Sequence, residues 1–275
     1  MAKYFNISRQ AYYKSEKLEN KKQLSEQLCL KRLQDIREDQ SKIGCRKLYY
    51  LMSDYLNTLP YKFSRDKLFE LLRNNNLLVK KKRRYAVTTN SNSLNPIYPN
   101  LLKDKQVTRA NEVWITDITY IKIKEGFVYL SLVADYYSRK ILGYNVSPDL
   151  STNGPFQALK RACNFSNIKD FHELIHHSDR GCQYRSIEYT KYLKNKSVNI
   201  SMSRSGNPYD NAVMERINGT LKDEFLLGET FSDILAVKKT AKRAITTYNE
   251  KRPHLSLMYK TPSYIYKNSI ENQIA

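Results

Sequence analysis

Residues 113–123 read Val-Trp-Ile-Thr-Asp-Ile-Thr-Tyr-Ile-Lys-Ile, and this stretch decides the fold. All of its residues except Asp117 and Lys122 are β-branched or aromatic, which is the composition of a β-strand. An ionised carboxylate in the middle of a strand is poorly tolerated unless it is paired, binds a cation or faces solvent. The stretch therefore predicts a strand in which Asp117 is either a site residue or an outward-facing polar residue.

Further strands and helices follow in an order that predicts the topology. Gly126 ends the first strand, and β-rich segments at 127–134 and 140–146 predict two more. Later segments predict a helix at 151–163, a strand at 173–177, a helix at 186–195, a strand at 198–202 and a helix at 211–226. This order predicts an α/β fold of ribonuclease-H-like type, with helices flanking a mixed sheet.

The N-terminal region has a different character. Residues 1–85 contain one glycine and one proline, and apolar residues recur there at helical spacing. We expect a small all-helical region with helices near 14–39, 43–56 and 64–75, the last capped by Ser64. Short helices joined by tight turns are compatible with a helix-turn-helix, although other helical bundles have the same pattern.

The chain is strongly basic. Its formal net charge is +20, with 47 Lys and Arg against 27 Asp and Glu. Residues 1–85 alone hold 21 of these cations against 9 acids, so we expect a DNA-binding region there. An anionic membrane is the second candidate partner, and a basic surface that only aids solubility is the third. The consecutive cations that end this region are expected to contact phosphates: Lys80, Lys81, Lys82, Arg83 and Arg84.

Composition also suggests the domain boundaries. Residues 86–110 are rich in Ser, Thr, Asn and Pro and predict a linker. We expect the catalytic core at 111–228 and a C-terminal helical extension at 229–275. No apolar run reaches the roughly 20 residues of a membrane helix, and no signal peptide is recognisable, so the expected location is the cytoplasm. The four cysteines lack the spacing of a zinc site.

Two more acids lie at positions that suit an active site. Asp179 directly follows the predicted strand 173–177, and α/β folds build their sites at the carboxyl ends of strands. Glu215 lies on the predicted helix 211–226, at the edge of an apolar stripe that can face the sheet. Taken singly, each acid also fits a structural role, as a turn aspartate or a solvated helix glutamate.

Together, Asp117, Asp179 and Glu215 indicate a metal site. Hard divalent cations such as Mg²⁺ take carboxylate oxygens as ligands, and the cations compensate the repulsion among converging acids. Two such ions about 4 Å apart can stabilise the attacking and leaving oxygens of a phosphoryl displacement. The three acids therefore predict two Mg²⁺ or Mn²⁺ ions and metal-dependent phosphodiester chemistry.

The residues around these acids resemble a known family. Asp179 and Glu215 are separated by 35 residues, the spacing of the D,D-35-E signature. The flanking motifs are W-x-x-D-x-T-Y at 114–120, H-S-D-R-G-x-Q-Y at 177–184, G-N-P-x-D-N-A-x-x-E at 206–215, and a tail with Tyr248-Asn249, Arg252-Pro253-His254 and Thr261-Pro262. In these motifs the chain resembles the catalytic, second-reading-frame subunit of insertion-sequence-three family transposases, relatives of retroviral integrases.

The resemblance implies a function, partners and a location. It implies a DNA transposase that cleaves phosphodiesters and transfers strands at insertion-sequence ends, with Asp117, Asp179 and Glu215 as metal ligands. The implied partners are double-stranded DNA (element ends and target), further copies of the chain on DNA, and an upstream-frame helix-turn-helix protein joined by frameshifting. The implied location is the bacterial cytoplasm, associated with the nucleoid.

The sequence leaves the roles of other residues, and two other functions, open. Arg180 and Lys222 are candidate DNA contacts, although a solvated lysine is as good an interpretation of Lys222. Arg252 and His254 either contact DNA or tie the tail to the core. The alternative functions are a catalytically inactive DNA-binding regulator derived from a transposable element and an RNA-cleaving nuclease on the same fold.

Overall fold

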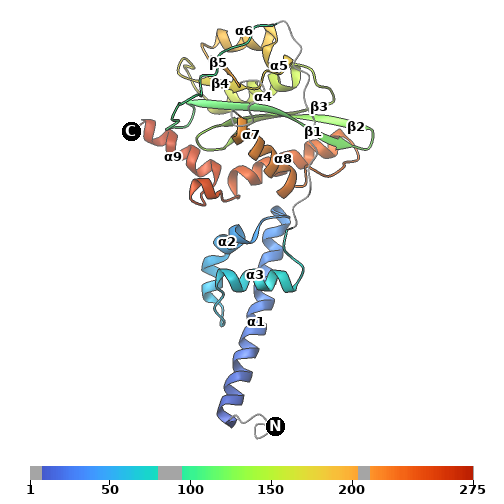
Figure 1. Ribbon diagram of the computed structural model, residues 1–275, viewed down its shortest axis with the longest axis vertical. Helices are drawn as coiled ribbons and strands as arrows, with labels where there is room; N and C mark the ends of the chain where they lie inside the picture. The colour runs from blue at the N-terminus through green and yellow to red at the C-terminus, as the bar shows by residue number, and fades with distance from the viewer. Residues whose placement is uncertain (1–7, 80–94, 204–210, 275) are drawn as a thin grey trace. The chain divides into compact units, whose positions relative to one another are not determined.

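The chain contains two compact units, residues 1–81 and 82–275. The structure, a computed structural model, describes residues 8–79, 95–203 and 211–274 (Figure 1). The predicted boundary between residues 85 and 86 lies outside these described ranges and stays a prediction. Within these ranges, none of the helices combines the length and the apolar character of a membrane span.

The N-terminal unit is built from three helices, as predicted: α1 (Arg9–Asp39), α2 (Cys45–Thr58) and α3 (Arg65–Asn74). Ser64 caps α3 by accepting a hydrogen bond from the backbone N–H of Lys67 (3.3 Å). Helix α1 begins earlier than predicted because the hydroxyl of Ser8 accepts from the N–H of Ala11. A core of its own holds the unit together, including Cys29, Leu33, Leu48, Met52, Leu68 and Leu72.

The second unit contains a five-stranded mixed sheet with the order β3-β2-β1-β4-β5. Its strands are β1 (Val113–Ile123), β2 (Gly126–Asp135), β3 (Ile141–Ser147), β4 (Ile175–Ser178) and β5 (Asn199–Met202). The first three strands are antiparallel neighbours, whereas β4 runs parallel to β1 and to β5. The predicted ribonuclease-H-like fold is confirmed.

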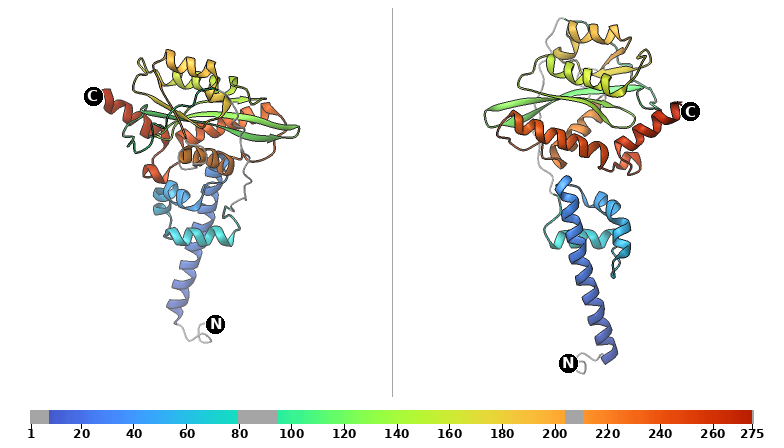
Figure 2. Two further views of the ribbon diagram at one scale, coloured as in Figure 1. Left: turned by 45° about the horizontal axis from the view of Figure 1, so that its top comes forward. Right: turned by 180° about the vertical axis from the view of Figure 1, so that it is seen from behind.

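Helices cover both faces of this sheet (Figures 1 and 2). One face carries α4 (Asn153–Ser166), α5 (Cys182–Arg185) and α6 (Ile187–Asn195), and the other carries α7 (Ala212–Glu224) and α8 (Ile234–Glu250). The short 3₁₀ helix η3 (Leu255–Leu257) leads to α9 (Pro262–Ile274), whose Tyr266 and Ile270 pack into the core on the α4 side. Alternation along β1 explains the two cores, because Trp114 packs with the first group while Ile115 and Ile121 pack with α7 and α8.

Helix α4 lies unusually close to β3 because of Gly143. A Cβ atom there would come within 2.2 Å of the carbonyl oxygen of Ala158 and 2.6 Å of the backbone nitrogen of Ala162. Any side chain would therefore push α4 away from the sheet.

Residues 95–101 lie along the free edge of β5. Met202 N–H donates to the carbonyl of Pro99 (3.1 Å), and Leu101 N–H donates to the hydroxyl of Ser201 (2.9 Å). The buried guanidinium of Arg185 donates to the carbonyls of Asn95 and Pro96. The described part of the predicted linker is therefore bound to the sheet edge as far as residue 101, which covers backbone groups that would otherwise be open to pairing.

Candidate active site

The register between two parallel strands brings Asp117 and Asp179 to the same level of the sheet. Ile115 in β1 pairs with His177 in β4. Asp117 and Asp179 each lie two residues further along, Asp117 within β1 and Asp179 just after the end of β4. Both carboxylates are partly buried at the carboxyl end of β4, where α/β folds place their sites.

The environment of these two carboxylates disfavours their charged forms. Burial and, second to it, the neighbouring charge of Asp179 together raise the pKa of Asp117 to about 7, against the lowering effect of hydrogen bonds from Ile118 and Asn218. Burial also raises the pKa of Asp179, opposed by a hydrogen bond from the N–H of Gly181 (2.9 Å). When both neighbouring acids are ionised they repel each other, and a bound cation would reduce that repulsion.

Helix α7 brings Glu215 to the same face of the sheet. Met214, Ile217 and Leu221 are buried against the sheet, whereas Glu215 is exposed on the flank of the helix. Its charge is the smallest of the influences that raise the pKa of Asp117, which places it within electrostatic reach of that carboxyl. The three predicted acids therefore share one region of the molecule, with Glu215 at its solvent side.

Asn218 is a functional candidate that the sequence interpretation missed. Its side-chain amide donates a 2.7 Å hydrogen bond to Oδ2 of Asp117 and so joins α7 to β1. Its own Oδ1 is buried without a hydrogen-bond partner among the described residues. The available signal was the three-residue spacing from Glu215, which puts both side chains on neighbouring parts of one helix face.

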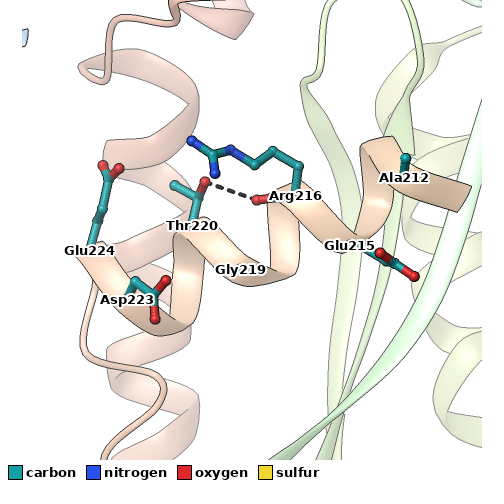
Figure 3. Close-up of a pocket in the computed structure, with 7 residues that line it drawn as sticks. All are labelled: Ala212, Glu215, Arg216, Gly219, Thr220, Asp223 and Glu224. Atoms are coloured by element: carbon teal, nitrogen blue, oxygen red, sulfur yellow. Dashed lines mark hydrogen bonds between the residues drawn. The ribbon is translucent and has the colours of Figure 1, made fainter. Parts of the chain in front are cut away.

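A hollow of about 340 Å³ follows the solvent side of α7 (Figure 3). In that view Glu215 and Arg216 point to opposite sides of the helix. The hydroxyl of Thr220 donates to the backbone carbonyl of Arg216 and is therefore engaged within the helix itself. The residues around the hollow are Ala212, Glu215, Arg216, Gly219, Thr220, Asp223 and Glu224.

The chemistry of the donor set fits a hard divalent cation. Carboxylates are the preferred ligands of Mg²⁺ and Mn²⁺, and Asp117 and Asp179 are two such groups in mutual repulsion. Among the residues that the structure describes, no three Asp, Glu, His or Cys side chains converge closely enough to hold a metal ion. The structure thus brings Asp117 and Asp179 together, with Glu215 beside them rather than in a closed three-acid cluster.

The remaining predicted site residues have ordinary partners or lie outside the described ranges. Arg180 donates from Nε to the carbonyl of Ser203 (2.9 Å) and so ties the loop after β4 to the end of β5. Lys222 is partly buried, two helical turns after Glu215. Cys182, the first residue of α5, is exposed. The predicted phosphate contacts at 80–84 lie outside the described residues.

The tail motif has a structural role in this unit. The guanidinium of Arg252 is buried and makes a bidentate ion pair with Glu224 at the end of α7, with N···O distances of 2.8 and 2.9 Å. It also contacts Nε2 of His254 (2.8 Å). Asn249 exchanges two hydrogen bonds with the backbone of Ile141 at the start of β3. These contacts fasten both α7 and α8 to the rest of the unit.

Comparison with known proteins supports this assignment of the fold. One integrase core domain family matches residues 107–208, and a second family of the same description matches residues 196–262. The transposase for insertion sequence element IS904 of Lactococcus lactis is 39% identical over 166 residues, which is 60% of this chain and 65% of that protein. A 31 kDa protein of insertion element IS600 from Shigella sonnei is 34% identical over 272 residues, 96% of each chain.

A solved structure has a related outline. The catalytic core domain of the HTLV-2 integrase, determined in complex with magnesium, is 18% identical with a TM-score of 0.47. The match covers 58% of this chain and 99% of that domain.

Proposed function

The chain belongs to the insertion-sequence-three family of transposases, and from that premise we propose that it cleaves and joins DNA phosphodiesters at the ends of its own mobile element. The proposed substrates are double-stranded element ends and target DNA. The observation that carries the proposal is the pair Asp117 and Asp179, held at one level of the sheet by the β1–β4 register, with Glu215 on the adjoining helix.

We propose that Asp117, Asp179 and Glu215 hold two Mg²⁺ or Mn²⁺ ions. When bound, the ions would polarise the scissile phosphate, activate the attacking hydroxyl and stabilise the leaving oxygen. Asn218 orients the carboxylate of Asp117 by donating to Oδ2, and the N–H of Gly181 does the same for Asp179. Preorganised hydrogen bonds of this kind fix the direction of the metal-binding oxygens before the substrate arrives.

The charge of the chain supports the choice of DNA as the substrate. A net charge of +20 attracts a polyanion, and each phosphate that a lysine or arginine neutralises releases condensed counterions. We propose that the basic helical unit holds the element ends, including through residues 80–84. We also propose that two or more copies assemble on DNA, because strand transfer needs both ends held together; an upstream-frame protein is a further proposed partner.

The test is a strand-transfer assay on the element's own terminal repeats with Mg²⁺ or Mn²⁺. We expect Glu215→Gln to abolish strand transfer while DNA binding stays within about twofold, because the substitution removes a metal ligand and little surface charge. Glu188→Gln is the matched control, the same substitution at an exposed acid on α6, and it should retain activity.

Two outcomes would contradict the proposal. If the unaltered chain binds element ends but joins no strands with either metal, the inactive DNA-binding regulator becomes the better assignment. If it cleaves RNA–DNA hybrids in preference to element ends, the protein is a nuclease on the same fold.

A further inference from the structure

Helix α8 presents a continuous row of cations to solvent. Its inward side, which includes Val237, Ala241 and Tyr248, belongs to the core shared with β1 and α7. The opposite side carries Lys238, Lys239, Lys242 and Arg243, all exposed, between the exposed residues Leu235 and Thr246. We call these four cations the α8 basic face. No acidic residue lies between Leu235 and Thr246.

The spacing of these cations works against the stability of the helix. Lys238 and Lys242 are four residues apart, as are Lys239 and Arg243, so like charges occupy the positions where opposite charges would stabilise a helix. None of the four lies in the last turn, where the helix dipole favours cations. Lys238, Lys239 and Lys242 form no ion pair with any residue in the described ranges.

The basic face lies on the same side of the sheet as the candidate active site. Helices α7 and α8 pack against each other and cover the face toward which Asp117 points (Figure 1). The packed inner side of α8 fixes the backbone from which the lysines extend. Five residues of helix span about 7.5 Å, which is roughly the rise of two phosphates of one strand along the DNA axis.

From this arrangement we propose that the α8 basic face binds the phosphate backbone of double-stranded DNA lying on the Glu215 side of the sheet. The inference rests on the proposed function, since it assigns to that reaction a DNA-binding surface that the three acids do not provide. Bound phosphates would reduce the repulsion between the lysines, so a DNA-binding role accounts for like charges at this spacing on one helix. A row of lysines contacts the backbone without reading bases, so the surface is insensitive to DNA sequence.

The experiment measures DNA affinity against salt concentration, without divalent metal, so that its result does not depend on catalysis. The probe is a fluorescently labelled duplex of arbitrary sequence, bound by the full chain. The test variant is Lys238→Gln/Lys239→Gln/Lys242→Gln. The matched control is Lys103→Gln/Lys169→Gln/Lys191→Gln, which removes the same charge from exposed positions elsewhere in the described second unit.

We expect the test variant to lower the slope of log affinity against log salt by roughly 2 to 3, since each lost phosphate contact removes about 0.9. The control should change the slope by less than about 0.5. The single variants Lys238→Gln and Lys242→Gln should each lower it by about 1 or less, which provides the answer if the triple variant does not fold.

Two results overturn the inference. Equal slopes for the two triple variants would mean that only bulk charge matters. An unchanged slope together with an altered sedimentation coefficient of the test variant would mean that this face binds another copy of the chain. If strand transfer itself cannot be detected, the salt slopes still decide whether the α8 basic face binds DNA, so the two proposals fail separately.

Discussion

At the scale of single residues, the candidate site depends on how Asp117 is surrounded. Burial and the charge of Asp179 raise its pKa to about 7, while Asn218 holds the carboxylate by a hydrogen bond. The site is therefore stable when Asp117 is protonated and under electrostatic strain when it is ionised without a cation. Two measurable consequences follow, one for stability and one for activity.

Asp117→Asn should make the protein more stable in the absence of metal at about pH 8. The pKa of Asp117 is higher in the folded than in the unfolded chain, so its contribution to stability is present below about pH 4 and is lost as pH rises through about 7. We expect roughly 1–3 kcal/mol of stabilisation at pH 8, less than the full pKa shift implies because the carboxyl is partly solvated. Thermal unfolding in chelator measures it.

The same unfolding experiment includes its own controls. The difference between variant and unaltered chain should vanish below about pH 3, where Asp117 is protonated in both the folded and unfolded states. Buried Asp135, whose pKa is raised to about 6, titrates with the same sign but is common to both proteins and cancels. Mg²⁺ should raise the unfolding temperature of the unaltered chain only. A variant that is less stable at pH 8 would refute the account of strain.

Asn218→Ala should lower strand transfer by about 10-fold to 100-fold without weakening DNA binding. A hydrogen bond to a charged group contributes about 1.5–3 kcal/mol, and its loss leaves the carboxylate of Asp117 less well oriented. Thr220→Ala is the control, since Thr220 lies on the same helix and its hydroxyl bonds only to the backbone of Arg216 among the contacts described. Equal losses of activity in both variants would indicate general damage to α7.

The sequence could identify some of these residues and not others. Asp117 is anomalous in a strand of β-branched residues, and the spacing from Asp179 to Glu215 matches a known signature, so the acids stand out from the local pattern. Asn218 does not, because an asparagine on a helix has many ordinary roles. Only the folded chain shows its amide beside a carboxylate 101 positions away.

At the scale of helices and strands, the ion pair between Arg252 and Glu224 fixes the end of α7. Arg252→Gln should destabilise the protein by roughly 3–5 kcal/mol, because it leaves the carboxylate of Glu224 in a poorly solvated position without its partner. The double variant Arg252→Gln/Glu224→Gln should recover a large part of that loss. Chemical denaturation measures both, and the exposed pair Lys267–Glu271 provides a control with a change below about 0.5 kcal/mol.

An additive result for the double variant would contradict this account, since substitutions of two groups in contact should not change the free energy of unfolding independently.

The sequence shows the tail motif that contains Arg252, but it does not show what Arg252 does. A basic residue after a helix is equally suited to DNA and to a buried carboxylate, and its 3% exposure is a property of the tertiary structure alone.

The first and last residues of a helix or strand could be predicted only where the local sequence marks them. Strand β1 has the predicted bounds, because the β-branched run begins at Val113 and ends before Gly126. Helix α5 was not predicted, since four residues are too few to show a periodic pattern. The first residues of helix α1 are exposed and therefore show no apolar pattern, so the sequence predicted too late a start. Only the cap at Ser8 marks where the helix begins.

At the scale of the whole molecule, the two units have separate hydrophobic cores. We therefore expect calorimetry to resolve two unfolding transitions, of which Mg²⁺ raises only the one belonging to residues 82–275, since a ligand stabilises the unit that binds it. A parallel scan in which Mg²⁺ is replaced by monovalent salt of equal ionic strength controls for screening. A single transition that shifts as a whole would show that the units unfold together.

The exposure of Cys182 has a practical consequence. The other three cysteines, Cys29, Cys45 and Cys163, are buried, so a thiol-directed dye should react with the native chain at one position. That position lies three residues after Asp179, on the first turn of α5. An environment-sensitive fluorophore attached there would report the arrival of cations or nucleic acid in real time, in a protein that needs no engineered labelling site.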